Sequence, residues 1–328
     1  MRLLPSAFWM KNPMKSEAII RGRFAPSPSG TLHLGNLLSS LLAWLDVRSQ
    51  GGVMLFRLED LDPDRSFEHY ANQMARDLEW LGLDWDEGWR PGSDQCRQGN
   101  RTAHYENALK QLREKGLVYD CYCSRAERLA ASAPHPGEAH DAGCGCRFLT
   151  EAEARQKRHS GRSPAQKCLI MPQTIRWTDV HYGFQEDPLQ SGQDDFIIRR
   201  SDGVFAYQLA VSVDDIEMGV TRVVRAQDLM RSTARQIYLI QTLGGSAPEY
   251  CHAPLLIAPD GRKLSKRDGD LNMDYFREHF TPEQLIGILA KLAGLQATSS
   301  PIKARELVES FSWESVPRNP IVIPSELI

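Results

Sequence analysis

Near the beginning of the chain, the hydrophobic and polar positions follow first a strand pattern, then a helix pattern, and then a strand pattern again. The segment "AIIRGRF" from Ala18 reads as a short strand, and a turn rich in proline, serine and glycine follows it. From His33 to about Ser49 leucines recur at helical spacing, which predicts a helix with one apolar stripe. The run "VMLFRLED" from Val53 is nearly all apolar and ends in carboxylates, as expected of a buried parallel strand. Together these segments predict a strand–helix–strand unit and a Rossmann-like α/β fold.

Cap signals predict the beginnings of four further helices. Ser66 is expected to cap a helix that runs to about Leu81, and Thr102 one that runs to about Lys115 and stops at Gly116. Ser232 is expected to cap "STARQIYLIQTLGG", which also ends in a glycine stop. Thr281 followed by Pro282 and Gln284 has the pattern of a capping box with a proline in the first turn.

Two segments carry weaker patterns. Residues 151–167 are polar and basic, which fits either a solvated helix and loop or a surface that faces RNA. After Leu295 the pattern predicts little further structure.

Length and composition limit the class of protein. The 328 residues are 41% hydrophobic and 25% charged, and no window approaches about 18 consecutive apolar residues, so we expect no membrane span. The first twenty residues lack the features of a signal peptide, which favours a cytoplasmic protein. The net charge of −3 leaves room for a local basic face that binds RNA.

The turn after the first predicted strand is a candidate phosphate site. It delivers the chain to a helix N-terminus, where unpaired N–H groups and the helix dipole favour an anion. Gly30 and Gly35 allow close approach, while His33 and Asn36 add side-chain donors. On these grounds alone, the histidine is as compatible with a structural role as with a catalytic one.

The neighbouring motifs resemble those of a known family. "HLGN", with "KLSKR" from Lys263 far downstream, is similar to the paired signatures of class I aminoacyl-tRNA synthetases. "RFAPSPSGTLHLGN", "RLEDLD", "YQLAVSVDDIEMGVTRVVRAQDL" and "KLSKRDG" resemble the glutamyl branch, in that order, over roughly residues 18–295. About sixty residues follow Lys266, too few for an anticodon-binding domain, so the chain looks most like a glutamyl-Q tRNA(Asp) synthetase.

This resemblance implies a set of site residues. It places the substrate glutamate against Arg23, Phe24, Ala25, Pro26, Ser27, Glu59, Tyr207 and Arg225. It places ATP against Gly30, His33, Gly35, Asn36, Lys263, Leu264, Ser265, Lys266 and Arg267. Of these, His33 and Lys266 are expected to be catalytic, with Mg²⁺ bridging the phosphates. The glutamyl enzymes usually carry asparagine four residues after the pocket tyrosine, where this chain has Val211.

Four of the seven cysteines form two close pairs, Cys121 with Cys123 and Cys144 with Cys146. Four thiolates can close tetrahedrally around Zn²⁺, and such a site leaves no open position, so we expect structural zinc. Related enzymes often use a tyrosine as one ligand, and here Ala142 stands at that position. Cys144 is the expected substitute, with His140 as the alternative; Tyr119 and Tyr122 are less favoured because phenolates are rarer ligands. The competing interpretation is a set of reduced thiols in a flexible loop, and Cys96, Cys168 and Cys251 are expected to be packing residues.

The expected domain organisation follows the motifs. We expect a mobile leader at 1–17, the first half of the nucleotide-binding α/β domain at 18–118, a zinc-bearing insertion at 119–170, the second half of the catalytic domain at 171–270, and a helical C-terminal part and tail at 271–328.

The resemblance implies that a monomer activates glutamate with ATP and transfers it to queuosine, the modified wobble base of tRNA(Asp). Two alternatives stay open: a truncated glutamyl-tRNA synthetase that charges a tRNA 3′ end, and a catalytically idle module that binds RNA or zinc.

Overall fold

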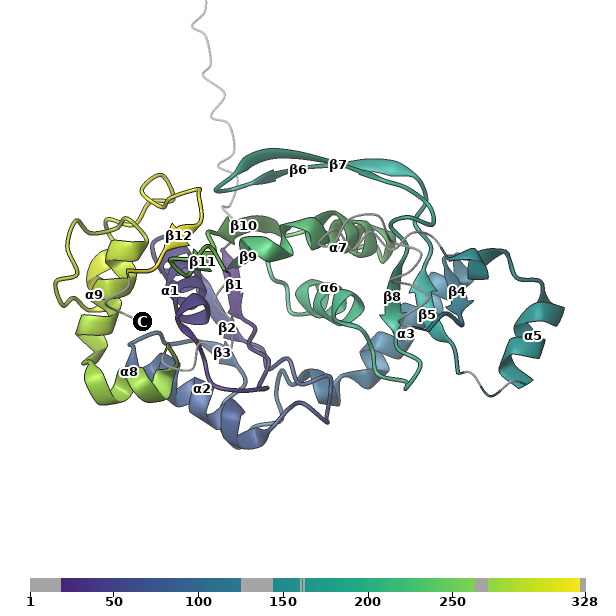
Figure 1. Cartoon of the computed structure of the whole chain (residues 1–328), viewed down its shortest axis with the longest axis horizontal. Helices are drawn as coiled ribbons and strands as arrows, with labels where there is room; N and C mark the ends of the chain where they lie inside the picture. Colours follow the sequence, from purple (N-terminus) through teal and green to yellow (C-terminus); the bar gives the residue numbers. More distant parts are fainter. Residues whose placement is uncertain (1–18, 125–143, 160, 162, 263–270, 325–328) are drawn as a thin grey trace, which may run out of the picture.

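The computed structural model describes residues 19–124, 144–159, 161, 163–262 and 271–324. Its helices and strands form a mixed α/β architecture (Figure 1). The helices are α1 (Leu34–Arg48), α2 (Glu68–Trp80), α3 (Thr102–Glu114), α5 (Glu151–His159), α6 (Tyr207–Glu217), α7 (Met230–Thr242), α8 (Met273–His279) and α9 (Pro282–Leu292). Among the described residues, no helix is both long and apolar enough to cross a bilayer.

The strands are β1 (Arg21–Phe24), β2 (Val53–Phe56), β3 (Glu87–Gly88), β4 (Val118–Cys121), β5 (Ala165–Cys168), β6 (Gln173–Asp179), β7 (Gly183–Leu189), β8 (Phe196–Arg199), β9 (Arg222–Ala226), β10 (Glu249–Ala253), β11 (Leu256–Ile257) and β12 (Ile321–Val322). The short 3₁₀ turns are η1 (Gln98–Asn100), η2 (Gly145–Phe148), η3 (Gln227–Leu229) and η4 (Ala304–Leu307).

The central sheet consists of two parallel halves. Strands β1, β2 and β3 form one half, and β9, β10 and β6 form the other, with β7 antiparallel at its edge. The halves meet where the backbone N–H of Thr221 donates to the carbonyl of Arg21, 2.9 Å away, which places β9 beside β1. The strand order therefore reverses between β1 and β9. In doubly wound sheets the carboxyl ends at such a reversal open a crevice for a ligand.

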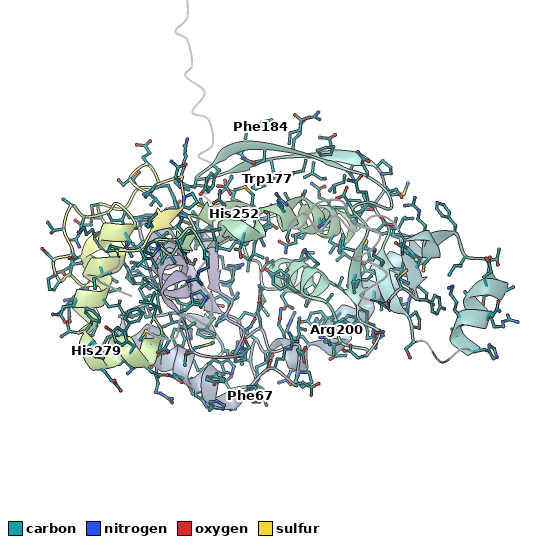
Figure 2. The ribbon with its side chains drawn as sticks, in the orientation of Figure 1. Phe67, Trp177, Phe184, Arg200, His252 and His279 are labelled. Carbon is teal, nitrogen blue, oxygen red and sulfur yellow. The ribbon has the colours of Figure 1, made fainter. Side chains whose placement is uncertain are left out.

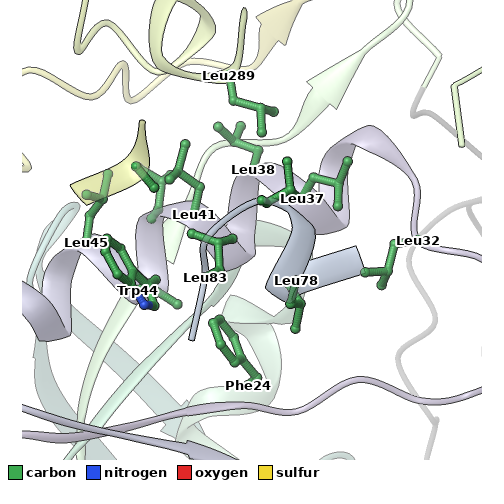
Figure 3. Packing of buried hydrophobic residues seen from close by; sticks show 14 of the residues in the cluster. Phe24, Leu32, Leu37, Leu38, Leu41, Trp44, Leu45, Leu78, Leu83 and Leu289 are labelled. Atoms are coloured by element: carbon green, nitrogen blue, oxygen red, sulfur yellow. The ribbon is translucent and has the colours of Figure 1, made fainter. Parts of the chain in front are cut away.

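Helix α1 anchors this sheet in the main hydrophobic core. It packs on β1 and β9, and on α9 and η4, so leucines around most of its circumference are buried. Figure 3 shows Leu37, Leu41 and Trp44 of α1 with Phe24 of β1 and Leu289 of α9. The sequence predicted a helix with a single apolar stripe. Because α1 is covered on several sides, it is instead buried almost all round.

The outer elements lie at the two ends of the molecule. Strands β4, β5 and β8 form a small antiparallel sheet that lies with α5 at one end, and α8 and α9 lie at the other (Figure 1). Helix α5 buries none of its residues, which agrees with a solvated helix in the polar segment. The hairpin of β6 and β7 forms a long ribbon above α7, with Phe184 exposed on it (Figures 1 and 2).

Three of the four predicted caps are wrong. Helices α2, α3 and α7 begin after Phe67, Arg101 and Leu229, and none of these makes a side-chain cap bond. Ser66 lies one residue too early, because the N–H of Phe67 is bonded to the carbonyl of Pro28 and this contact sets where the helix begins. Thr102 and Ser232 are already helical, so they cannot cap these helices.

The other local signals are confirmed. Thr281 and Gln284 form the capping box of α9, with the proline in its first turn. Gly116 and Gly244 follow the ends of α3 and α7 with φ values of 71° and 84°, a conformation that favours glycine.

Few regular elements follow Leu295 in the part of the chain that the structure describes, as the pattern predicts, but the segment nevertheless packs into the core. Ala304, Leu307, Val316 and Ile323 are buried in the main core, and β12 pairs with β11. The segment has few regular elements, so its sequence carries no periodicity, yet its apolar side chains are shared with α1 and α9.

Candidate active site

A cavity of about 500 Å³ lies at the carboxyl ends of β1 and β9, where the strand order reverses. All eight residues expected to contact glutamate line it, and so do four of those expected to contact ATP. These twelve are Arg23, Phe24, Ala25, Pro26, Ser27, Gly30, His33, Gly35, Asn36, Glu59, Tyr207 and Arg225. Lys263, Leu264, Ser265, Lys266 and Arg267 lie outside the described residues.

His33 is the N-cap of α1. Its Nδ1 accepts hydrogen bonds from the backbone N–H groups of Gly35 at 3.1 Å and Asn36 at 3.3 Å. A neutral imidazole that accepts at Nδ1 carries its proton on Nε2, which is therefore the nitrogen that can donate to an anion. Two amides of the first turn are thus occupied by the histidine, whereas the sequence suggested that the turn amides face phosphate.

Gly35 leaves room for this cap. A Cβ at position 35 would lie 3.1 Å from Cε1 and 3.2 Å from Nδ1 of the His33 ring. A side chain there would press on the imidazole, which would have to shift by a few tenths of an ångström, so the glycine allows close approach of a side chain as well as of a ligand.

Arg23 brings a buried positive charge to the end of β1. It is only 6% exposed, and its Nη1 donates to the carbonyl of Val224 on β9 at 3.0 Å. Burial lowers the pKa of Arg23, and the carboxylate of Asp215, 3.8 Å from Nε, acts in the opposite direction. The bond to β9 shows that the arginine is oriented by the neighbouring strand.

Glu59 brings a negative charge to the same cavity. Nη2 of Arg57 lies 3.1 Å from its carboxylate, and Nη1 of Arg57 lies 2.7 Å from Asp215. Burial raises the pKa of Glu59, while Arg57 and Arg23 oppose that rise. The cavity therefore combines a carboxylate with a cation at its wall, as a zwitterionic ligand requires.

Sequence reasoning missed Arg57, Asp214 and Asp215. A signal was present in the sequence. An arginine directly after an apolar strand, and a pair of aspartates on a largely apolar helix, must find partners when they are buried. Asp214 accepts bonds from Arg101, Gln98 and Tyr105, and Arg57 connects this group to the cavity.

Arg225 is held more tightly than its expected role suggests. Its Nε donates to His252, Nη1 to Gln236, and Nη2 to Thr233 and to the carbonyl of Leu229. Four of the five N–H groups of the guanidinium are therefore bonded within the protein. To bind a substrate carboxylate with two N–H groups, Arg225 would have to exchange at least one of these bonds for a bond to the substrate.

Tyr207 begins α6 and lines the cavity, and burial raises the pKa of its phenol, which stays a neutral donor. Val211, one turn further along, is 1% exposed and does not belong to the cavity lining. The structure thus gives no direct contact between position 211 and the cavity.

The four paired cysteines converge at the end of β4 and the beginning of η2. The Sγ atoms of Cys121 and Cys144 are 3.5 Å apart, those of Cys123 and Cys146 are 3.6 Å apart, and all four lie within 4.8 Å of one another. Tetrahedral zinc with Zn–S bonds of about 2.3 Å requires Sγ atoms roughly 3.8 Å apart. The donor set and spacing fit a metal ion.

The other ligand candidates differ in their placement. His140 lies outside the described residues. The Tyr119 hydroxyl donates to Asp195 at 3.0 Å and lies 4.0 Å from the sulfur of Cys144. Cys168 and Cys251 are fully buried, as expected of packing residues, whereas Cys96 is half-buried.

Comparison with known proteins gives consistent results. The family model of the tRNA synthetases class I (E and Q), catalytic domain, matches residues 19–326. The chain is 45% identical over 316 residues to a Symbiobacterium thermophilum protein named glutamyl-Q tRNA(Asp) synthetase, covering 94% of this chain and 97% of that protein. A protein of the same name from Nitratidesulfovibrio vulgaris is 44% identical over 323 residues, with the same coverage.

Glutamate–tRNA ligases are also similar. The ligase of Synechococcus sp. (strain JA-3-3Ab) is 39% identical over 284 residues, which are 84% of this chain but 57% of that protein. The crystal structure of the glutamate-tRNA synthetase from Elizabethkingia anophelis superimposes with a TM-score of 0.77 at 25% identity, covering 94% of this chain and 69% of that one.

Proposed function

The chain belongs to the glutamyl-Q tRNA(Asp) synthetase family of class I ligases, and from this we propose that it activates glutamate with ATP and transfers it to queuosine in tRNA(Asp). The observation that carries this proposal is the cavity where Arg23, Arg225 and Glu59 meet beside the histidine-capped helix. Relatives of this name align over nearly their whole length, which favours it over the charging of a tRNA 3′ end.

We propose that charge complementarity selects glutamate. Arg23 and Arg225 face the two carboxylates, and Glu59 faces the ammonium group. Both arginines and the glutamate are more than nine-tenths buried, so their interactions are weakly screened by water. Arg57 holds Glu59 and Asp215 lies beside Arg23 before the substrate arrives, so these two groups need little reorganisation when it binds.

Activation is an in-line substitution at phosphorus. An oxygen of the substrate α-carboxylate attacks the α-phosphorus of ATP, the bond to the bridging oxygen breaks, and pyrophosphate leaves. We propose that His33 donates from Nε2 to the phosphates, and that Lys266 neutralises the growing negative charge, with Lys263 and Arg267 nearby. Mg²⁺ would supply further charge neutralisation on the phosphates.

In the second step a nucleophilic group of queuosine attacks the activated carbonyl carbon, and AMP leaves with the electron pair of the C–O bond. The acyl group is thereby transferred without any further input of energy, because the adenylate is a mixed anhydride.

We propose that Cys121, Cys123, Cys144 and Cys146 hold a structural zinc ion. Four sulfur ligands complete the tetrahedron, which leaves no position for a substrate. Such an ion would join β4 to η2 across the segment 125–143 and stabilise the small sheet.

The site of attachment tests the proposed function. The protein is incubated with ATP, labelled glutamate and queuosine-containing tRNA, and nuclease fragments are mapped for label; the same tRNA(Asp) without queuosine is the control. We expect label in the anticodon fragment of the modified tRNA alone. Label at the 3′ end would instead identify a minimal charging synthetase, and no label with no ATP turnover would identify an idle module.

A further inference from the structure

Three buried polar side chains, those of Arg225, His252 and Asp179, are joined by hydrogen bonds behind the cavity, and we call them the relay. Arg225 stands on β9, His252 on β10 and Asp179 on β6, which are neighbouring strands. They are 5%, 0% and 1% exposed, respectively. Figure 2 shows His252 beneath the β6–β7 ribbon beside Trp177, whose ring centroid is 5.9 Å from that of the histidine.

The hydrogen bonds of the relay determine the tautomer of His252. Nε of Arg225 can only donate, and it lies 3.1 Å from Nε2 of His252, so Nε2 must be unprotonated. A neutral His252 then carries its proton on Nδ1, which lies 2.6 Å from Oδ2 of Asp179. The aspartate therefore selects the tautomer that can accept from the arginine.

Asp179 is itself held by the turn between β6 and β7. Its Oδ1 accepts from the backbone N–H groups of His181 at 2.9 Å and Tyr182 at 2.8 Å. The carboxylate has little freedom to rotate, because both of its oxygens are bonded. The turn therefore fixes Asp179, Asp179 orients His252, and His252 is bonded to Arg225 in the wall of the cavity.

Electrostatic interactions favour one charge state of the relay, with His252 neutral and Asp179 ionised. Burial lowers the pKa of His252 and Arg225 lowers it further, while Asp179 opposes them; Thr233 and the Tyr250 ring also face the imidazole. Burial works against the charge of Asp179, but the bonds from His252 and the turn outweigh it and lower the pKa of the carboxyl. At neutral pH a neutral histidine therefore stands between two opposite charges.

The bond to His252 is the one that orients the guanidinium at Nε. The two Nη atoms bond to Gln236, to Thr233 and to the carbonyl of Leu229, and one N–H of Nη1 has no acceptor among the described residues. Without the Nε bond the plane of the guanidinium would be free to rotate. Rotation would change which of its N–H groups face a ligand in the cavity.

We propose that Asp179 and His252 are positioning residues that orient Arg225 for a substrate carboxylate and thereby set the affinity for the amino acid. The proposal rests on the proposed function, in which Arg225 contacts glutamate. Neither residue lines the cavity, so each acts only through the arginine.

The variant Asp179→Asn tests the relay, because an amide can donate toward Nδ1 and so favours the wrong tautomer. In ATP–pyrophosphate exchange, with tRNA present, we expect the KM for glutamate to rise at least tenfold and the KM for ATP to change less than twofold. Glu186→Gln, on the exposed face of the same hairpin, is the matched control and should change neither.

A double variant separates positioning from structure. His252→Gln can keep an acceptor near the position of Nε2 and needs no tautomer, so it should retain more glutamate affinity than His252→Leu. In the His252→Gln background, Asp179→Asn should add less than a twofold further loss. An equal rise in both KM values, or the same loss in both backgrounds, would show that Asp179 is merely structural.

The tautomer can be measured whether or not the proposed function holds. In ¹⁵N spectra of the imidazole, we expect His252 to be protonated at Nδ1 in the wild type and at Nε2 in Asp179→Asn. A wild-type proton on Nε2 would overturn the relay. Wild-type protein that shows this Nδ1 tautomer but no glutamate-dependent exchange would overturn the proposed function and leave the geometry of the relay standing.

Discussion

Arg57 lies wholly inside the protein, with its guanidinium among three carboxylates. Glu59 and Asp215 are its close partners, and Asp214 lies 3.9 Å from Nε. Burial opposes its charge, yet these carboxylates together raise the pKa of Arg57. At the residue scale the site therefore depends on a cation that does not itself line the cavity.

Arg57→Met is expected to lower the free energy of unfolding by about 3–5 kcal/mol, because it leaves buried carboxylates without their counterion. Urea unfolding measures the loss. Arg176→Met is the control: its ion pair with Glu186 is exposed, so its removal should cost at most about 1 kcal/mol. Similar small losses in both variants would contradict the role given to Arg57.

Lys266→Ala is expected to leave glutamate binding nearly unchanged and to slow adenylate formation greatly, because this lysine is assigned to the phosphates alone. Calorimetric binding of glutamate and single-turnover formation of the adenylate separate the two effects. Lys291→Ala, in the last turn of α9, serves as the matched control. An equal loss of binding and rate would refute the assignment.

At the scale of elements, helix ends show where local rules hold. The capping box of α9 is formed by residues three apart, so the sequence contains all of its parts. Helix α2 begins where a loop contact from Pro28 places it, and nothing within a few residues of Ser66 encodes that contact.

Thr281→Ala is expected to lower the free energy of unfolding by about 1 kcal/mol, since it removes the side-chain acceptor of the α9 cap. Ser66→Ala is the contrasting variant and should be nearly neutral, because the structure gives Ser66 no capping role. Denaturant midpoints at equal slope measure both. A larger loss in Ser66→Ala than in Thr281→Ala would contradict the observed helix boundaries.

Cys121→Ser is expected to lower the zinc content of the purified protein and its thermal stability, while adenylate formation is affected less. The site joins β4 to η2 and not to the cavity, so the catalytic groups should keep their positions. Metal analysis and thermal unfolding are the measurements, with Cys96→Ser, outside the cluster, as control. Unchanged zinc would remove Cys121 from the ligand set.

At the scale of the whole molecule, the segment after α9 closes the main core. Ile323 is fully buried, and its N–H donates to the carbonyl of Ile257. Trp313 donates to the buried carboxylate of Asp46 on α1 at 2.7 Å. Residues more than 250 positions apart thus stabilise the helix whose N-terminus faces the cavity.

Ile323→Ala is expected to lower the free energy of unfolding by about 2–5 kcal/mol, because a large side chain is removed from the core. Val322→Ala, at the adjacent position but 54% exposed, should cost about 0.5 kcal/mol or less. Chemical unfolding compares them. Equal small losses would mean that the segment is not part of the core.

The sequence by itself determined the strand–turn–helix–strand unit and the capping box of α9, and its resemblance to a known family implied the motif residues, of which the twelve described members line one cavity. The domain boundaries, the monomeric state and the cytoplasmic location stay predictions. The unit and the capping box are readable because each is a short run whose spacing reflects local geometry.

Only the tertiary structure decided how Arg225 meets His252 and Asp179, where α2 begins, and that Ile323 belongs to the core. These contacts join strands and segments that are distant in the chain, and they depend on sheet order and register. A pattern of residues a few positions apart does not encode which strands become neighbours, because burial of the shared apolar faces decides that for the molecule as a whole.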